Sequence, residues 1–395
     1  MPARKLVAEN CIEKPHNINF WLFLYSLQKI YLYQIMEPLS IVHVIDRLEC
    51  GGAERILITL ANMFDERNHK VTVITIVAPG SIRPQLNKNI KFLCLHRTWK
   101  WNPFTMHKLI KEISKYDITH VHLSFNYRYT YAALKLCLSR VCVFYQEHHG
   151  DRVNAPVSFV DKKMFHSSLF IAVSKNLKQW AVSKLKMNED HVFLLPNIIL
   201  RASNASKKKE NSKFVRLVQV ANFIPVKNIE FTLNLLQQLL IRDPGGYHIT
   251  FIGHIYDTIY FNKIKSLIHQ KNLAEHISLI HDCDNVQSHL HRYDFALQTS
   301  TSESGPLVLL EYMAQRLPFL ASDTGEVAQQ VKSRIDGIIM STFNVEEWVA
   351  GLQHLITHQH EIKNKLEELF DEISSPGKYY KACLAIYKRG MEFCN

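Results

Sequence analysis

Two glutamates, Glu303 and Glu311, stand eight positions apart around a Ser-Gly-Pro turn in the stretch TSESGPLVLLEYMAQRLPF, residues 301–319. Proline has no backbone N–H to leave unpaired and a fixed φ, so we expect Pro306 to occupy the first position of a helix. The turn before it would leave backbone N–H groups at the positive end of the helix dipole, where anions bind. The stretch therefore predicts an anion site with a carboxylate on either side.

A nucleotide with a diphosphate and two sugars suits such a site. The carboxylate of Glu311, in the second turn, would reach the ribose hydroxyls, and Glu303 would accept hydrogen bonds from a sugar on the far side. The alternative is that both glutamates are ordinary exposed acids. The residues expected to hold the phosphates are Ser304, Gly305, Pro306, Leu307 and Val308.

Two further features follow predicted strands. Gly51 and Gly52 lie between a strand and a helix, where adjacent glycines let a backbone approach a phosphate closely, although a plain turn is the alternative. His148 or His149, in the stretch QEHHGDR, could hydrogen-bond a sugar hydroxyl. Both features gain weight from their position, because ligands bind at the carboxyl ends of parallel strands.

Lys227 precedes a predicted helix in the stretch VANFIPVKN, residues 220–228. Its ammonium could neutralise a phosphate as a point charge. The next residue, Asn228, is of a type that caps helices through its side chain. A solvated surface lysine is the alternative.

Short apolar strands alternate with helical stretches from residue 39 onward, which predicts parallel sheets covered on both faces. The predicted strands are 39–45, 70–77, 118–124, 141–148, 169–174, 192–196, 215–221, 248–253, 277–282, 294–300 and 317–322. The polar run RASNASKKKENSK, residues 201–213, interrupts the alternation and reads as a linker. We therefore expect two doubly wound, Rossmann-like α/β domains that face each other across a cleft. The expected segments are an N-terminal extension at 1–35, domains at 36–200 and 214–373, and a C-terminal helix at 374–395.

The net charge of +11 lies entirely in the first half of the chain. Residues 1–200 carry 26 Lys and Arg against 15 Asp and Glu, whereas residues 201–395 carry 21 of each. This asymmetry favours an anionic membrane surface as a partner of the N-terminal half. Nucleic acid is not expected, because no interleaved aromatic and basic motif and no reading helix stand out. A basic surface without a partner is the alternative.

The eight cysteines show no C-x-x-C motif and no regular framework. We therefore expect reduced thiols in a cytoplasmic protein and no zinc site. Residues 18–36 are apolar and aromatic but short for a membrane span and interrupted by polar residues. We expect residues 1–35 to be an upstream extension that precedes the native start, with an interfacial helix as the alternative.

These features together resemble the retaining glycosyltransferases of the GT-B fold, in particular the large family 4 of the sequence-based classification. The resemblance runs from about residue 39 to the C-terminus. Its most specific element is the E-x7-E motif of Glu303 and Glu311. The chain carries further matching motifs in family order, namely GGAER near the start, AVS at 172–174, PNI at 196–198, Lys227, and SDTGEVAQQV at 322–331.

The resemblance implies roles for individual residues. Glu303 would contact the donor sugar, Lys227 would stabilise the leaving diphosphate, and His148 would approach the reacting sugar. Glu311 would bind the donor ribose. The Gly51-Gly52 turn would face the phosphates across the cleft. In relatives the C-terminal helix, here residues 377–393, packs back on the N-terminal domain.

Three positions depart from the family pattern. Asn222 stands where the family often has an arginine, and Gly253 followed by His254 is what remains of a G-x-G. Arg316 replaces a glycine, at a cost of roughly 1 kcal/mol if its backbone is left-handed. Asn222 in place of an arginine removes one phosphate-binding cation and so bears on donor affinity. None of the three departures removes either glutamate, and we expect activity to survive.

We therefore expect a glycosyltransferase that uses a UDP- or GDP-type sugar donor and needs neither a metal nor another cofactor. The acceptor would be a saccharide or a lipid-linked sugar, in the assembly of bacterial polysaccharide or lipopolysaccharide. The expected location is the cytoplasm, peripheral on the inner face of the cell membrane. The alternatives are a catalytically weakened nucleotide-sugar-binding or scaffold protein and a nucleotide-sugar epimerase of the same fold.

Overall fold

The computed structural model of the chain describes residues 38–49, 51–149, 152–153, 156–202, 212–281, 283, 285–303 and 305–394. The chain divides into two compact units, Met1–Leu39 and Ser40–Asn395, and the described secondary structure belongs to the second. The extension expected at residues 1–35 lies outside the described residues. The same holds for residues 203–211 of the expected linker.

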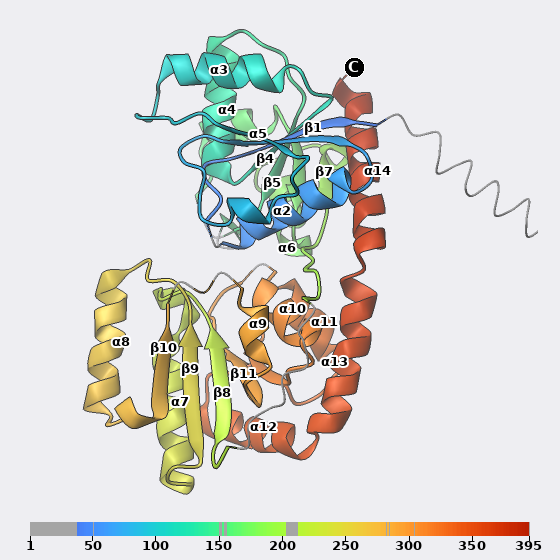
Figure 1. The fold of residues 1–395 in the computed structure, drawn as a ribbon. Helices are drawn as coiled ribbons and strands as arrows, with labels where there is room; N and C mark the ends of the chain where they lie inside the picture. The colour runs from blue at the N-terminus through green and yellow to red at the C-terminus, as the bar shows by residue number, and fades with distance from the viewer. Residues whose placement is uncertain are drawn as a thin grey trace, which may run out of the picture. The chain divides into compact units, whose positions relative to one another are not determined.

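The first sheet has seven strands in the order β3-β2-β1-β4-β5-β6-β7, and all neighbours pair in parallel. Figure 1 labels four of these strands, β1, β4, β5 and β7. The chain reverses its direction of winding between β1 and β4, as in doubly wound sheets. The strands are β1 (Ser40–Ile45), β2 (Lys70–Thr75), β3 (Lys91–Cys94), β4 (Ile118–His122), β5 (Val143–Glu147), β6 (Leu169–Ala172) and β7 (Val192–Leu194). The α-helices are α2 (Gly52–Asp65), α3 (Pro103–Ile113), α4 (Ser124–Leu136), α5 (Phe159–Phe165) and α6 (Lys175–Ser183).

The second sheet repeats this plan with six parallel strands in the order β10-β9-β8-β11-β12-β13. The strands are β8 (Val215–Val220), β9 (Tyr247–Ile252), β10 (Ile277–Ile280), β11 (Phe295–Gln298), β12 (Phe319–Ser322) and β13 (Ile339–Met340). The α-helices are α7 (Ile229–Arg242), α8 (Thr258–Gln270), α9 (Gln287–Leu290), α10 (Leu307–Ala314), α11 (Glu326–Lys332), α12 (Val345–Thr357), α13 (Gln359–Ile373) and α14 (Pro376–Cys394).

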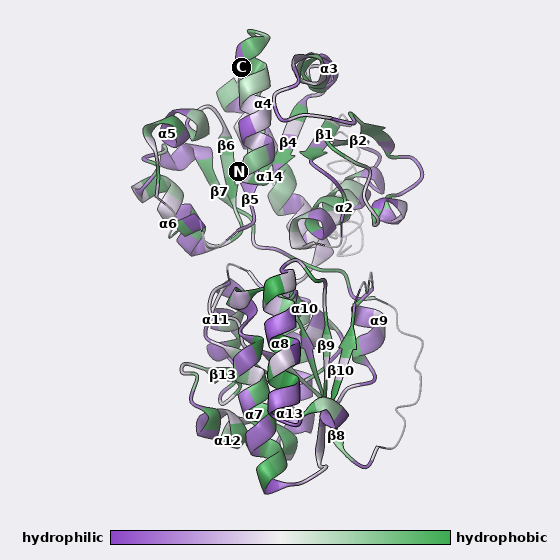
Figure 2. Ribbon diagram, turned by 90° about the vertical axis from the view of Figure 1, so that its left-hand side faces the viewer, coloured by the Kyte–Doolittle hydropathy of each residue, from purple (hydrophilic) through white to green (hydrophobic). Residues whose placement is uncertain are grey.

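The strand pattern explains why the fold class could be predicted. The strands of both sheets carry mainly hydrophobic residues, whereas the helices also carry hydrophilic ones (Figure 2). Each predicted strand is present, with ends that differ by a few residues. Two further strands, β3 and β13, were not predicted, because both are short and only partly buried. The expected doubly wound α/β class is confirmed.

Helix α14 contacts the first sheet and its helices along much of its length. Tyr380 Oη lies 2.8 Å from His69 Nε2, and Tyr387 Oη lies 2.7 Å from His120 Nδ1. Near the helix end, Arg389 donates a hydrogen bond to Asp190. These polar contacts are all made to residues of the N-terminal half of the chain.

The prediction that every cysteine is a reduced thiol is wrong for one pair. Cys142, just before β5, forms a disulfide with Cys394 at the end of α14, with Cα atoms 5.7 Å apart. The pairing joins positions 252 residues apart, and no spacing motif signals it. Among the described residues, Cys94, Cys137 and Cys383 are free cysteines.

Within the described residues, no helix is both long enough and apolar enough to cross a membrane.

Candidate functional site

A cavity of about 300 Å³ is lined by residues that follow the carboxyl ends of strands in both sheets. This placement agrees with the rule that ligands of doubly wound sheets bind beyond those ends. Ser304 lies outside the described residues. The predicted site residues that line the cavity are Gly51, Gly52, His148, Asn222, Lys227, Gly253, Glu303, Gly305, Pro306, Leu307, Val308 and Glu311.

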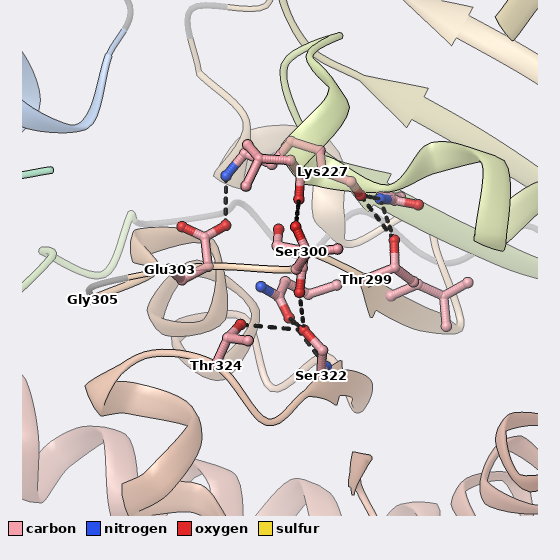
Figure 3. A network of polar contacts seen from close by, with 12 residues as sticks. Lys227, Thr299, Ser300, Glu303, Gly305, Ser322 and Thr324 are labelled. Atoms are coloured by element: carbon pink, nitrogen blue, oxygen red, sulfur yellow. Dashed lines mark hydrogen bonds and ion pairs between the residues drawn. The ribbon is translucent and has the colours of Figure 1, made fainter. Parts of the chain in front are cut away.

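Lys227 and Glu303 form an ion pair in this cavity, with the ammonium nitrogen 2.5 Å from the carboxylate oxygen (Figure 3). Lys227 ends a short 3-10 turn, Pro225–Lys227, and Glu303 follows β11. Both side chains are largely shielded from solvent. A cation and a carboxylate thus meet where a leaving group and a sugar could lie side by side, a pairing that the sequence analysis did not anticipate.

Hydrogen bonds between the two loops bring this pair together (Figure 3). Thr299 Oγ1 donates to the backbone oxygen of Lys227 at 3.0 Å and accepts from Gln219 Nε2 at 3.0 Å. On the other side, Ser322 Oγ donates to the backbone oxygen of Ser300 at 2.6 Å. The loop after β11 is therefore fixed to its neighbours on both sides, which limits where Glu303 can point.

Helix α10 begins one residue later than predicted. Pro306 is the N-cap, with φ −65° and ψ 107°, and the helix starts at Leu307. As the first helical residues, Leu307 and Val308 have no acceptor for their N–H groups inside the helix. The helix end still lies in the cavity, as expected for an anion site.

Glu311 forms an ion pair with Arg55 of α2, a residue to which the sequence analysis gave no role. Burial raises the pKa of the Glu311 carboxyl, and the Arg55 guanidinium acts against that rise. The guanidinium therefore favours the ionised form, which can accept hydrogen bonds from hydroxyl groups. Arg55 belongs to the GGAER stretch, so the motif pointed to its place but not to its partner.

A glycine is required at one of the predicted cavity positions, Gly253, by close contacts with the backbone. A Cβ at Gly253 would lie 2.0 Å from the backbone oxygen of Ala221, so β8 and β9 could not end side by side. At Gly51 a Cβ would meet only the carboxylate end of the flexible Glu54 side chain, which can move away, so this contact does not by itself require a glycine. Burial raises the pKa of Glu54 to about 7. Close packing against Ala221 therefore explains the glycine at position 253, beside its predicted role in donor binding.

His148 lies at the edge of the cavity, directly after β5. Its backbone N–H and that of His149 donate to the buried Glu147 carboxylate at 2.9 and 3.0 Å. On the sheet side, His148 Nε2 lies 3.1 Å from His122 Nδ1. Burial lowers the pKa of His148 to about 3, so the ring is neutral at physiological pH.

Three other expectations can be compared with the backbone. Asn222 Oδ1 accepts from the His254 N–H at 3.2 Å. The prediction that Asn228 caps a helix through its side chain is wrong: Asn228 is left-handed, at φ 50°, and makes no such bond. A capping side chain requires an extended backbone at that position. Arg316 is left-handed, at φ 52°, which is the condition under which replacing the family's glycine carries a cost.

Two features of the site were not anticipated. Asn197, after β7, lines the cavity, and its side-chain nitrogen lies 3.4 Å from the backbone oxygen of Gly305. Within the described residues, the histidines His43, His120 and His122 are also buried together, each with a nitrogen within 4.8 Å of the others. The PNI motif contains Asn197, but three histidines in two separate strands leave no spacing signal.

Family comparisons agree with this architecture. The family described as Glycosyltransferase Family 4 matches residues 50–199, and the family described as Glycosyl transferases group 1 matches residues 201–369. The two matches follow each other along the chain and correspond to the two sheets.

Individual relatives are distant. An uncharacterized glycosyltransferase of Haemophilus influenzae is 23% identical over 78% of this chain and 87% of its own length. A capsular polysaccharide biosynthesis glycosyltransferase, CapH of Staphylococcus aureus, is 24% identical over 52% of this chain and 57% of its own length. The structure of Anabaena HepE in complex with UDP-glucose shares the fold, with a TM-score of 0.72, 14% identity, and coverage of 89% and 100% of the two chains.

Proposed function

The chain belongs to the GT-B glycosyltransferases, and we propose that it transfers a sugar from a UDP- or GDP-type donor with retention of anomeric configuration. The observation that carries this proposal is the Lys227–Glu303 ion pair beside the N-terminus of α10, in a cavity lined by both sheets. A diphosphate at the helix end and a sugar at the glutamate would fit together there. The solved structure of HepE holds UDP-glucose, which is a donor of this kind.

The residues of the cavity can stabilise the charge that develops when the bond between sugar and diphosphate breaks. The N–H groups of Leu307 and Val308 and the ammonium of Lys227 are fixed before the reaction, so they need no reorganisation as charge appears on the leaving group. Glu303 orients the donor sugar, and Glu311 accepts hydrogen bonds from the ribose. We propose that these protein groups suffice without a metal ion.

The donor assignment can be tested by thermal shift with a panel of UDP- and GDP-sugars. A bound donor at a hundredfold excess over its Kd stabilises the fold by about 2.7 kcal/mol. Glu311→Ala should lose this stabilisation, because the ribose hydroxyls lose their acceptor. Glu372→Ala is the control, since it removes a carboxylate that pairs with Arg334 outside the cavity. A wild-type shift in Glu311→Ala would refute the ribose assignment, and donor hydrolysis or product formation must accompany binding if the protein is an enzyme.

The acceptor we propose is a saccharide or lipid-linked sugar of a bacterial surface polysaccharide or lipopolysaccharide, reached from the inner face of the cell membrane. The name of CapH supports this class of acceptor. A solvent-exposed surface next to α3 suits an anionic membrane. We call it the aromatic–basic surface, and it consists of Trp99, Lys100, Trp101, Phe104, Lys108 and Lys111.

The large aromatic side chains of this surface are exposed to solvent. Trp99, Trp101 and Phe104 are 55%, 50% and 83% exposed. Aromatic side chains favour the lipid interface, and each lysine near an anionic surface contributes about 1 kcal/mol. The aromatic–basic surface therefore combines both forces that hold a protein on an anionic bilayer.

Vesicle sedimentation tests the proposed membrane contact. The double variant Trp99→Ser with Trp101→Ser should bind anionic vesicles at least about tenfold more weakly, because burying one large apolar side chain contributes roughly 1.5–3 kcal/mol. Ile259→Ser is the control, since Ile259 on α8 is 83% exposed and lies in the second sheet's half. Equal binding of the double variant and the wild type would show that this surface is not the contact.

A further inference from the structure

A carboxylate is buried at the carboxyl end of β5, where the chain enters the wall of the donor cavity. Glu147 is the last residue of this strand, and its side chain is 1% exposed. A buried charge is costly unless it is both paired and hydrogen-bonded. The position of Glu147 therefore calls for an explanation.

Four donors satisfy the two oxygens of this carboxylate. Glu147 Oε1 accepts from the backbone N–H groups of His148 at 2.9 Å and His149 at 3.0 Å. Glu147 Oε2 accepts from the Tyr145 hydroxyl and, at 3.3 Å, from Arg152 Nε. Two bonds to each oxygen use the full accepting capacity of an ionised carboxylate. Glu147 therefore acts through the groups around it.

Tyr145 and Arg152 hold the carboxylate in place. Tyr145 stands two residues before Glu147 and so lies on the same face of the sheet. Its ring is fully buried and stacks on Tyr127, with ring centroids 4.8 Å apart. Burial raises the pKa of Tyr145, so the hydroxyl keeps its proton and donates. Arg152 supplies the opposite charge, and the carboxylate is fixed before any ligand binds.

The bonds to Oε1 determine how the chain leaves the sheet. One residue before Glu147, the backbone oxygen of Gln146 still accepts from the N–H of Leu123 at 3.0 Å. After Glu147, two successive N–H groups turn to a side-chain oxygen of their own segment. Such local bonds compete with pairing to a neighbouring strand. β5 therefore ends at Glu147, and the chain turns there into the cavity wall, which includes His148 and His149.

This turn sends the two histidine side chains in different directions. His148 Nε2 lies 3.1 Å from His122 Nδ1, and His122 Nε2 lies 3.1 Å from His43 Nδ1, so His148 joins a row of buried histidines. Burial lowers the pKa of all three, which makes this a chain of neutral rings. His148 Nδ1 is buried as well. His149, by contrast, is exposed and lines the cavity, so it can offer a ring nitrogen to a ligand.

We propose that Glu147 is a positioning residue, whose carboxylate sets the turn after β5 and thereby holds His149 against the donor sugar. The inference rests on the proposed function, in which this cavity binds the donor. The family resemblance implied the contact with the sugar for His148, and the geometry assigns it to His149. The groups proposed to hold the diphosphate and the ribose follow strands of the second sheet. Loss of Glu147 should therefore affect the reaction more than donor binding.

Two substitutions of Glu147 separate the turn from the ion pair. Glu147→Ala removes every acceptor of the carboxylate. Glu147→Gln keeps a carbonyl oxygen for the two backbone N–H groups, and the Tyr145 hydroxyl can rotate to accept from the new NH2 group. The ion pair with Arg152 is then lost, while the turn keeps its acceptor.

A third substitution controls for the loss of a paired carboxylate as such. Glu112 of α3 lies in the same half of the chain and pairs with Lys91 and Lys115. It does not line the donor cavity. Glu112→Ala should therefore reproduce the loss of a shielded ion pair without touching the turn after β5.

Hydrogen–deuterium exchange of residues 145–149 tests the turn without any substrate. In the wild type and in Glu147→Gln, the backbone amides of His148 and His149 should exchange slowly. In Glu147→Ala they should exchange at least about tenfold faster, since each amide loses its hydrogen bond. In Glu112→Ala they should exchange at the wild-type rate.

The kcat for sugar transfer tests the link to His149. Glu147→Ala and His149→Ala should each lower kcat at least about tenfold, with a smaller change in the KM for the donor. Glu147→Gln should stay within about threefold of the wild type, and Glu112→Ala should match it. In the double variant, Glu147→Ala with His149→Ala, the two losses should not add, because the carboxylate acts through a ring that is already missing.

Fast exchange of the His148 and His149 amides in the wild type would overturn the proposal whether or not any variant folds. Wild-type kcat in Glu147→Ala, additive losses in the double variant, or equally fast exchange in Glu147→Gln and Glu147→Ala would also overturn it. A failure of the proposed function looks different, because the exchange pattern would be as expected but no donor would support transfer.

Discussion

Lys227→Ala should lower kcat for sugar transfer by about 10²–10³-fold, the loss that follows removal of one fixed group that stabilises developing charge. The ammonium lies against Glu303 in the cavity, where the leaving diphosphate would gain its charge. The charge on the diphosphate increases as the bond to the sugar breaks, so the loss falls on the reaction more than on donor binding. Transfer kinetics and donor Kd, measured on the same samples, check this difference.

Two controls make the result specific. Lys227→Arg keeps the charge and should recover part of the rate, although its planar group cannot reproduce the contacts of an ammonium. Lys263→Ala removes a lysine that pairs with Glu230 on the surface of α8 and should leave transfer unchanged. Equal losses in kcat and donor affinity for Lys227→Ala would mean that Lys227 only binds the donor.

The strands could be predicted because buried parallel strands are continuous apolar runs bounded by polar turns. β3 and β13 were not predicted because their side chains are only partly buried, so neither strand forms a continuous apolar run. The disulfide between Cys142 and Cys394 depends on where α14 ends against the first sheet. The positions of two distant segments relative to each other are not encoded in any local pattern.

The site could be predicted at the level of residues but not of partners. The rule that ligands bind at strand ends brought Glu303, Lys227 and His148 to one place. The pairing of Lys227 with Glu303 depends on the hydrogen bonds of Thr299, which no motif marks. The pairing of Glu311 with Arg55 joins α10 and α2, helices that accompany different sheets, so no local sequence pattern predicts it.

The row of histidines shows a different limit. The alternation of a strand places His120 and His122 on one face, and this much is visible in the sequence. That His43 lies beside them follows from the order of the strands, which puts β1 next to β4. A chain of hydrogen bonds through three rings therefore becomes visible only with the sheet in place.

The free energy of unfolding should fall more steeply with decreasing pH in the wild type than in a variant that lacks the buried His43 ring. Burial lowers the pKa of His43 to about 3, whereas the ordinary value is 6.5. The unfolded chain therefore binds a proton that the folded chain rejects. The stabilising contribution is complete above pH 6.5 and is lost as the pH falls toward 3, by about 1.4 kcal/mol for each pH unit and each such ring.

Urea unfolding at pH 7.5 and pH 5.5 measures this loss. His43→Leu should show a shallower dependence of the free energy of unfolding on pH, because leucine binds no proton in the unfolded chain. Glu54, whose pKa burial raises to about 7, changes stability in the opposite direction, but both proteins share it and the comparison removes it. His107→Leu, at an exposed position of α3, should keep the wild-type dependence. A parallel pH dependence in His43→Leu and the wild type would mean that His43 is charged in the folded protein, which would contradict a chain of neutral rings.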